Sequence, residues 1–291
     1  MQQFPRPHRS VLYVPATNQK ALAKVAELAC DAVIFDLEDS VAPGEKQAAR
    51  QSLAAHFQAP RMRHERIIRI NSLAGDWGAD DLKLSIACRP DAILLPKVNT
   101  PRDIQAVDEM LDEDDADIAI WIMIETPKAI LNLGALAEFG RDRGARLGCF
   151  VTGTNDLAKE TGVAVTPDRR YLVPYLAQVV VAARAGGVDV LDGPCNDFRD
   201  LDVFAKECAE AAAMGFDGKT LIHPAQIAAA NAAFSPSQAA VVEAEAIRAA
   251  FALPENAGKG VLSLDRRMIE RLHLDQAEKL LAKAAAMKGN R

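Results

Sequence analysis

The segment DAVIFDLEDS (31–40) contains the unit from which most of the chain is built, a short β-branched apolar run followed at once by charged residues. The run 32–36 is typical of a buried strand, and Ala- and Leu-rich stretches with helical spacing lie on both sides of it. Eight such runs can be recognised: 11–14, 32–36, 66–70, 92–95, 118–124, 147–151, 188–191 and 218–221. Helical spacing recurs between them, for example over 18–30, 101–111 and 201–214. This alternation indicates repeated βα units around a parallel sheet.

Eight consecutive units favour a closed (β/α)8 TIM barrel, and the full length of 291 residues is ordinary for one. A doubly wound sheet would alternate in the same way, but the first strand is followed by no Gly-rich dinucleotide fingerprint. We therefore predict a catalytic barrel domain over residues 1–234.

After Phe234 the alternation stops. The stretch 234–251 predicts a helix with Ser235 as its N-cap and Pro236 at its first position. A breaker-rich segment (253–260) then leads to a final amphipathic helix, expected from about Asp265 to Met287. We predict that residues 235–291 form a C-terminal helical extension that adds no strand and acts as a lid on the barrel or on a neighbouring subunit.

Composition excludes several classes of partner and location. The net charge of −6 favours neither a nucleic acid nor an acidic membrane as partner. No apolar stretch approaches the roughly 20 residues of a membrane span. The five cysteines are scattered and lack CxxC spacing, so we expect buried free thiols in a reducing cytoplasm. The acidic run 108–117 is expected to be a solvated helix end.

In a barrel, catalytic groups lie where the carboxyl ends of the strands meet. The predicted strands end in ionisable or amide groups to an unusual extent. These groups are Asp36, Glu38 and Asp39 after the second strand, Arg69 and Asn71 on the third, Lys97 after the fourth, Glu125 after the fifth, Asp156 beyond the sixth, Asp192 on the seventh and His223 after the eighth.

Glu125 and Asp156 follow neighbouring strands and present two carboxylates, the oxygen ligands that suit Mg²⁺. Zinc is disfavoured because no His or Cys stands beside them. The simpler interpretation is that each carboxylate complements a helix dipole and binds no metal. For Glu125 this is suggested by the following Thr126 and Pro127, which are typical of a helix start.

Arg69 would be costly to bury without an anionic partner. One interpretation is a structural salt bridge to Glu38 or Asp39. The other is that its guanidinium holds a substrate carboxylate or a developing enolate.

A resemblance becomes specific when the motifs are taken together. RSVLYVP (9–15) and DAVIFDLEDSVAP (31–43) are followed in order by RIN (69–71), LPKV (95–98), IET (124–126), TGTNDLA (152–158), LDGP (191–194), FDGKTLIHPAQI (216–227), FSPS (234–237) and MIE (268–270). The chain resembles the citrate lyase β-subunit and malyl-CoA lyase family over nearly its whole length. The resemblance implies a trimeric or hexameric barrel with Mg²⁺ that cleaves a 3-hydroxy-carboxyacyl-CoA thioester to an acyl-CoA and a 2-oxo acid.

The resemblance also assigns roles to individual positions. It implies that Glu125 and Asp156 bind Mg²⁺, that Arg69 binds substrate and that Glu38 and Asp39 lie around the water shell of the metal. It places Lys24 and Arg9 in a segment that approaches the CoA phosphates, although Lys24 is equally well explained as a solvated helix lysine. His223, Pro224 and Gln226 match a signature that we interpret as structural.

Three departures from the family pattern concern CoA binding and the reaction. Ala16 stands where the family usually has Gly, and Asn18 stands near a usual basic residue. Glu270 replaces the aspartate that reaches the active site of a neighbouring subunit as an acid–base group; the simpler interpretation is a polar residue on the last helix. Three other functions stay open: a malyl-CoA-type thioesterase, a metal-dependent aldolase acting without CoA, and a non-enzymatic subunit of a complex.

Overall fold

The computed structural model describes residues 6–142 and 144–289. It divides into two compact units, His8–Phe234 and a smaller unit built chiefly from Ser235–Arg291. We describe each unit by itself.

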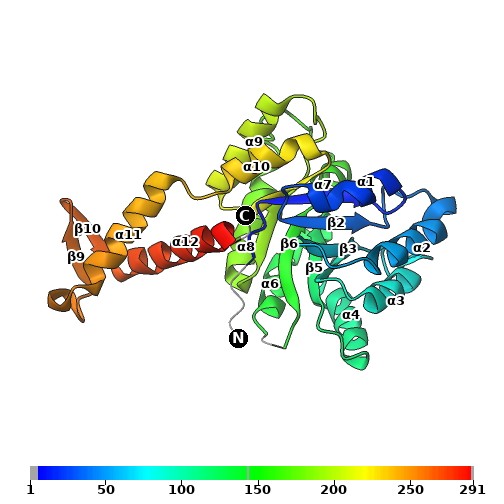
Figure 1. Cartoon of the computed structure of the whole chain (residues 1–291), viewed down its shortest axis with the longest axis horizontal. Coiled ribbons are helices and arrows are strands. Elements are labelled where there is room, and N and C mark those ends of the chain that lie inside the picture. The colour runs from blue at the N-terminus through cyan, green and yellow to red at the C-terminus, as the bar shows by residue number, and fades with distance from the viewer. Residues whose placement is uncertain (1–5, 143, 290–291) are drawn as a thin grey trace. The chain divides into compact units, whose positions relative to one another are not determined.

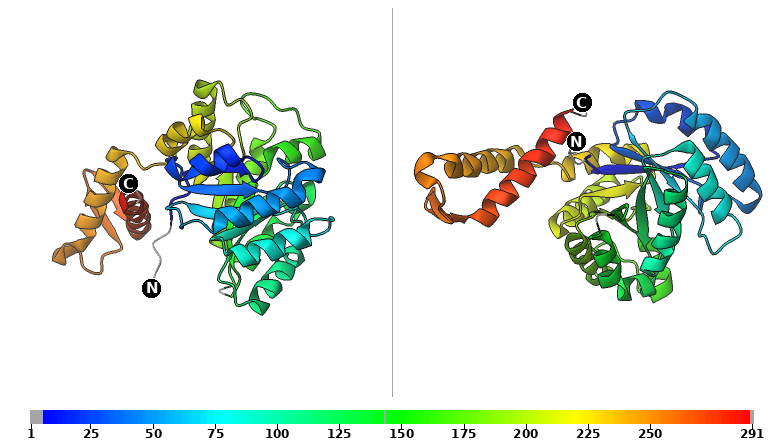
Figure 2. Two further views of the ribbon diagram at one scale, coloured as in Figure 1. Left: turned by 45° about the vertical axis from the view of Figure 1, so that its right-hand side comes forward. Right: turned by 90° about the horizontal axis from the view of Figure 1, so that it is seen from below.

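The larger unit is a closed barrel of eight parallel strands in chain order, in which β8 pairs back with β1 (Figures 1 and 2). The strands are β1 Ser10–Pro15, β2 Ala32–Asp36, β3 Glu65–Arg69, β4 Ala92–Leu95, β5 Ala119–Ile124, β6 Leu147–Thr152, β7 Asp189–Asp192 and β8 Gly218–Leu221. The (β/α)8 prediction is confirmed, and each of the eight predicted strands agrees with the observed one to within one residue at either end.

Helices surround the strands on the outside. They are α1 Gln19–Lys24, α2 Lys46–Phe57, α3 Gly78–Cys88, α4 Pro101–Glu113, α5 Pro127–Leu131, α6 Leu133–Gly140, α7 Thr154–Thr161, α8 Val173–Gly186, α9 Leu201–Met214 and α10 Ile227–Ala233, with short 3₁₀ turns at Val25–Glu27, Pro43–Glu45 and Pro224–Gln226. Helix α4 shows why such segments are helical: Thr100 and Asp103 form a capping box at its start, and Ile104, Val107 and Leu111 form its buried stripe. The acidic run 108–117 is therefore the outer, solvated end of α4, as predicted.

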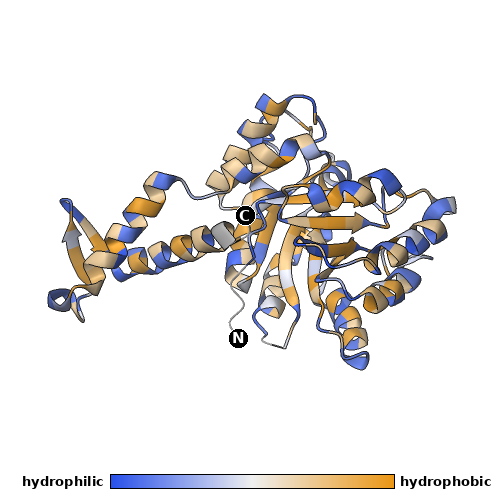
Figure 3. Ribbon diagram, in the orientation of Figure 1, coloured by the Kyte–Doolittle hydropathy of each residue, from blue (hydrophilic) through white to orange (hydrophobic). Residues whose placement is uncertain are grey.

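The barrel strands consist mostly of hydrophobic residues (Figure 3). Because side chains alternate along each strand, these apolar residues fall into two sets. One set packs between strands and helices. The other fills the barrel interior and includes Ile34, Ile67, Trp121, Met123 and Val151. Two residues after Ile34, Ile67 and Met123, at the carboxyl ends of the strands, the inward positions hold the charged residues Asp36, Arg69 and Glu125.

The smaller unit contains α11 Gln238–Ala252, a 3₁₀ turn Pro254–Asn256, β9 Val261–Leu264, β10 Arg267–Glu270 and α12 Arg271–Gly289. Strands β9 and β10 pair antiparallel. The prediction that this segment adds no strand is wrong, as is a final helix beginning near Asp265. Asp265 and Arg266 both have positive φ (48° and 63°), which gives the tight turn that matches strand twist. Leu262 and Ile269 face the core of the unit.

The start of α11 also differs from the prediction. Ser237, not Ser235, is the N-cap, because its side chain accepts a hydrogen bond of 3.1 Å from the amide of Ala240. Pro236 therefore precedes the cap instead of occupying the first helical position.

Other sequence predictions can be checked directly. All five cysteines are free thiols, and all but the half-buried Cys88 are buried, as expected. No helix within the described ranges is both long and apolar enough to cross a membrane.

A charged cluster lies at the amino end of the barrel. Glu65 begins β3 and Asp189 begins β7, and the His8 ring bonds to both, at 2.7 Å and 2.8 Å. The ring also meets the Trp121 side chain edge-on at 5.0 Å. Burial alone would lower the pKa of His8, but the Glu65 charge and the hydrogen bond to Asp189 raise it to about 10. Strands β3 and β7 are not neighbours in the barrel, so His8 links them.

This cluster predicts a pH-dependent contribution to stability. Because the folded-state pKa of His8 lies above its ordinary 6.5, its stabilisation is complete below about pH 6.5 and is lost as the pH rises towards about 10. We expect His8→Gln to lower the free energy of unfolding by about 1.5–3 kcal/mol at pH 6, and by much less at pH 9.5. Urea unfolding of both proteins at the two pH values measures this. A difference that does not change with pH would contradict the assignment.

Candidate active site

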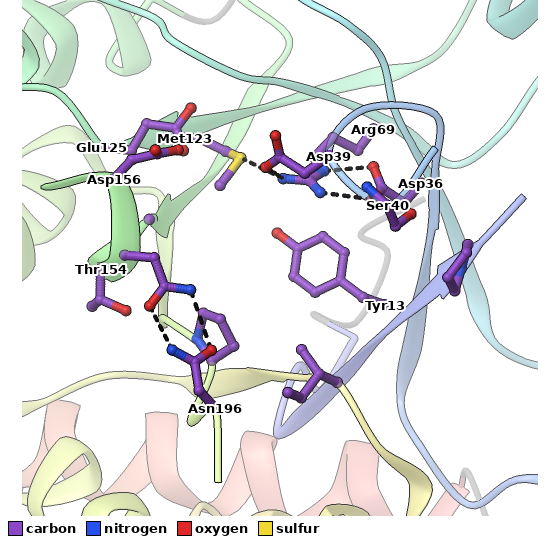
Figure 4. Close-up of a pocket in the computed structure, with 15 residues that line it drawn as sticks. Tyr13, Asp36, Asp39, Ser40, Arg69, Met123, Glu125, Thr154, Asp156 and Asn196 are labelled. Carbon is purple, nitrogen blue, oxygen red and sulfur yellow. Dashed lines mark hydrogen bonds and ion pairs between the residues drawn. The ribbon is translucent and has the colours of Figure 1, made fainter. Parts of the chain in front are cut away.

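A cavity of about 350 Å³ opens at the carboxyl ends of the strands. Figure 4 shows its lining, with Arg69 and Asp36 on one side and Glu125 and Asp156 on the other. The remaining lining residues are Tyr13, Pro15, Asp39, Ser40, Met123, Gly153, Thr154, Asn155, Pro194, Asn196 and Ile222. Five of the ten predicted strand-end groups line this cavity. The other five, Glu38, Asn71, Lys97, Asp192 and His223, are not among its lining residues.

Arg69, the last residue of β3, is held by Asp36, the last residue of β2. Its Nε and Nη2 each donate to one oxygen of the Asp36 carboxylate at 2.7 Å, the bidentate geometry of a strong ion pair. Both side chains are buried, with 8% and 2% exposed. Burial alone would raise the pKa of Asp36, but the Arg69 guanidinium lowers it below its ordinary value. The ring of Tyr13 lies 4.8 Å from the guanidinium and stacks beside it.

The third nitrogen of Arg69, Nη1, contacts the acidic pair Glu38 and Asp39. It lies 3.0 Å from Glu38 Oε2 and 3.2 Å from Asp39 Oδ2. Glu38 is nearly buried, and this Oε2 accepts no hydrogen bond from any described residue. Burial raises the pKa of Glu38 to about 8 in spite of the nearby arginine. The predicted salt bridge of Arg69 to Glu38 or Asp39 thus exists, but Asp36 is its principal partner.

Glu125 follows β5 and is 1% exposed. Its Oε1 accepts a hydrogen bond of 2.7 Å from the backbone amide of Lys97. Gly153 leaves room for it, because a Cβ there would lie 2.4 Å from Glu125 Cβ and 2.5 Å from Oε2. Burial raises the pKa of Glu125, and the Lys97 charge opposes this shift. The helix-start interpretation applies to Thr126, which caps α5, and not to Glu125 itself.

Asp156 lies in the first turn of α7 and forms an ion pair with the Lys97 ammonium, which is also 3.6 Å from Glu125 Oε1. One cation thus already lies close to both carboxylates. Two carboxylates with no His or Cys ligand beside them fit Mg²⁺, which takes few protein oxygens and completes its shell with water and substrate. The donor chemistry therefore fits the magnesium ion that the sequence predicts.

The part of the cavity wall that follows β6, β7 and β8 is fixed by side-chain hydrogen bonds. Asn155 and Asn196 exchange side-chain hydrogen bonds of 3.2 Å and 2.8 Å (Figure 4). Buried Gln226 accepts from the amides of Ile222 and His223 and donates to Cys195 O. These contacts agree with the structural interpretation of the HPAQ signature, because they fix backbone at the cavity wall.

Comparison with known proteins identifies the family. Residues 9–224 match the model described as HpcH/HpaI aldolase/citrate lyase. The chain belongs to this family.

Relatives within it differ in their reactions. The chain is 43% identical to a (3S)-malyl-CoA thioesterase of Cereibacter sphaeroides, covering 97% of this chain and 96% of the relative. It is 32% identical to the mitochondrial citramalyl-CoA lyase of Rattus norvegicus, over 97% and 87%. Among solved structures, the protein CitE from Mycobacterium tuberculosis in complex with magnesium, acetoacetate and coenzyme A has a TM-score of 0.77 and 26% identity, covering 96% and 98%.

Not every residue suggested by the family resemblance reaches the cavity. Arg9 precedes β1, at the amino end of the barrel, where its side chain pairs with Asp31 at 2.7 Å and 2.8 Å. A strand of six residues separates it from the cavity, roughly 20 Å. Arg9 therefore does not line this cavity, and its role in substrate binding stays a prediction. Lys24 ends α1 and is exposed. Glu270 belongs to the other unit, on β10.

Tyr13 and Gly153 were not proposed from the sequence, and Lys97 was named only as a strand-end group without a role. Tyr13 lines the cavity, Lys97 contacts both carboxylates and Gly153 makes room for Glu125. The period-two pattern of β1 could have indicated Tyr13, since it follows interior Val11 by two residues.

The tight approach of Gly153 to Glu125 gives a prediction. Gly153→Ala forces the Glu125 side chain to move and breaks its bond to Lys97, so we expect a loss of about 1–3 kcal/mol in the free energy of unfolding. Gly134→Ala is the matched control, because a Cβ at that helical position meets nothing within 4 Å. Urea unfolding compares the two. Equal effects of both substitutions would show that Glu125 is not constrained by Gly153.

Proposed function

We propose that the protein is a Mg²⁺-dependent enzyme that hydrolyses the thioester of a hydroxy-dicarboxylic acyl-CoA of the malyl-CoA type. The main observation in support of this proposal is the cavity in which Arg69 faces Glu125 and Asp156. Full-length similarity to a malyl-CoA thioesterase at 43% identity favours hydrolysis over the other reactions of the family.

The cavity suits the acyl part of such a substrate. At about 350 Å³ it holds a small dicarboxylic acid, while the nucleotide part of CoA must lie outside it. Arg69 offers Nη1 to an anionic oxygen, and the exposed Asp39 is the partner that such an oxygen would replace. Lys24 is exposed beyond the first strand and could attract phosphate groups.

Glu125 and Asp156 would hold the Mg²⁺. When bound, the ion supplies Lewis-acid chemistry, polarising oxygens of the bound acid. Arg69 stabilises negative charge that develops on the thioester oxygen, and Asp36 keeps its guanidinium in place. Glu38 and Asp39 set the charge around Nη1.

Carbon–carbon cleavage is the second candidate, favoured by the 32% identity to a citramalyl-CoA lyase. Cleavage of malyl-CoA gives acetyl-CoA and glyoxylate without consuming water. Hydrolysis consumes one water and gives free CoA and malate. Both reactions place negative charge on the thioester oxygen, so the Arg69 geometry serves either one.

The deciding experiment follows these products. Malyl-CoA, citramalyl-CoA and citryl-CoA are incubated separately with the enzyme and Mg²⁺, and products are identified by mass spectrometry. Free CoA with the matching hydroxy acid, which is malate for malyl-CoA, supports the thioesterase. Acetyl-CoA with the matching 2-oxo acid, which is glyoxylate for malyl-CoA, assigns the lyase instead. No conversion of any of the three esters would refute both candidates.

The metal assignment gives its own prediction. We expect Glu125→Ala and Asp156→Ala each to abolish binding of oxaloacetate, pyruvate and glyoxylate in the presence of Mg²⁺, because an acid chelates the ion that they hold. Titration calorimetry measures this binding, and circular dichroism checks that the barrel remains folded. Unchanged affinity in Glu125→Ala would show that the ion binds elsewhere.

We also propose that Glu270 serves the active site of a neighbouring subunit in a homo-oligomer, as a general acid–base group. The alternation along β10 supports this. Ile269 is 5% exposed and faces the core of its own unit, whereas Met268 is 66% exposed and shares the outward face of the hairpin with Glu270. The outward apolar Met268 next to a carboxylate suits contact with a partner.

This proposal predicts a loss of turnover on a CoA ester of on the order of 100-fold in Glu270→Ala, with Mg²⁺ and oxo-acid binding intact. Glu278→Ala, an exposed carboxylate on α12, is the control and should be near wild type. Mixing Glu270→Ala with Arg69→Ala subunits should recover part of the activity, since some mixed interfaces contain both groups. Absence of recovery after verified subunit exchange would refute the shared site.

A further inference from the structure

Lys97 holds an unusual position directly after β4. Its φ of 54° is in the left-handed region, which residues other than glycine rarely adopt. The backbone is held there on both sides: the amide donates to Glu125 Oε1 at 2.7 Å, and the carbonyl accepts from Asn99 Nδ2 at 2.9 Å. Strained backbone of this kind persists only where its surroundings fix it.

The side chain of Lys97 has a separate set of contacts. Its ammonium forms an ion pair with Asp156 and lies 3.6 Å from Glu125 Oε1. About a third of the side chain is exposed, against 27% for Asp156 and 1% for Glu125. The lysine therefore neutralises part of the charge of two carboxylates that would otherwise repel each other.

The same two carboxylates hold the Mg²⁺ of the proposed function. An ammonium bonded to Asp156 and a divalent ion bonded to Asp156 and Glu125 compete for the same oxygens and repel each other. The flexible stem and partial exposure let the ammonium leave without unfolding anything, whereas the amide of Lys97 can stay on Glu125.

We infer that Lys97 is an internal counterion that Mg²⁺ replaces: its ammonium holds the two carboxylates together in the metal-free protein and is displaced when the ion binds, while its amide positions Glu125 in both states. This inference rests on the proposed metal site. It makes Lys97 a positioning residue that weakens metal affinity in exchange for a preformed site.

The backbone conformation allows a clean test. Lys97→Gly removes the ammonium and keeps the amide, and glycine accepts a positive φ without strain. Lys97→Met removes the ammonium and keeps the bulk of the stem, and Lys97→Arg keeps a cation. Lys128→Met, which removes an exposed lysine on neighbouring α5, controls for general electrostatics.

Titration calorimetry with Mg²⁺ alone and thermal unfolding with EDTA or saturating Mg²⁺ are measured on each protein. We expect Lys97→Gly and Lys97→Met to bind Mg²⁺ roughly fivefold to tenfold more tightly than wild type, since a competing cation is gone. Both variants should have a lower melting temperature than wild type in EDTA, and saturating Mg²⁺ should restore most of this difference. Lys97→Arg should return the affinity towards wild type, and Lys128→Met should change little.

Two results would overturn the inference in different ways. If wild type binds Mg²⁺ and both ammonium-free variants bind it equally or more weakly, Lys97 is not a competing counterion, and the metal site stands. If wild type shows no Mg²⁺ binding and no stabilisation by Mg²⁺, the metal site and the counterion exchange are both refuted. A structural role alone would lower the melting temperature in EDTA and in Mg²⁺ alike.

Discussion

The ion pair between Arg69 and Asp36 is the interaction on which the rest of the site depends. A guanidinium keeps its charge at any accessible pH, so at 8% exposure it requires a partner. Asp36 supplies both oxygens to it and also accepts from the amides of Glu38, at 2.9 Å, and Ser40, at 3.1 Å. One carboxylate therefore fixes both the cation and the acidic loop beside it. Without it, the loop would lose its anchor and Arg69 would be a buried, poorly compensated charge.

The strand periodicity explains how an apolar barrel carries charges at both ends. Along β5, Trp121 and Met123 fill the interior and the next inward position is Glu125. On β3, Glu65 stands at the amino end and Arg69 at the carboxyl end, with Ile67 between them. The charged layers are separated by packed hydrophobic side chains, so His8 can stabilise one end while the other end remains open to ligands. This matches the usual division of a barrel into a stabilising face and a catalytic face.

The fold and half of the site follow from local pattern, and the remainder depends on contacts between distant residues. All eight strands could be predicted because each βα unit repeats the same signal. The hairpin of the smaller unit was missed because its two short strands lie outside the repeating βα pattern, which made the equally short β4, β7 and β8 recognisable. Arg69, Glu125 and Asp156 were found from their places at strand ends. The roles of Asp36 and Lys97 were not, since each is defined by partners on other strands.

The charge balance of the cavity favours the binding of cations. Burial raises the pKa of Glu38 to about 8, so Glu38 adds less negative charge than an exposed glutamate would. The carboxyl groups of Asp36, Asp39, Glu125 and Asp156 outnumber the two cations Arg69 and Lys97 around the cavity. A dicarboxylic acid entering this field is repelled, whereas a divalent cation is attracted and cancels the excess. Arg69 alone cannot reverse this, because Asp36 already occupies two of its three nitrogens. If Glu125 and Asp156 hold the ion as proposed, the ion would offset this excess of carboxylates before an anionic substrate binds.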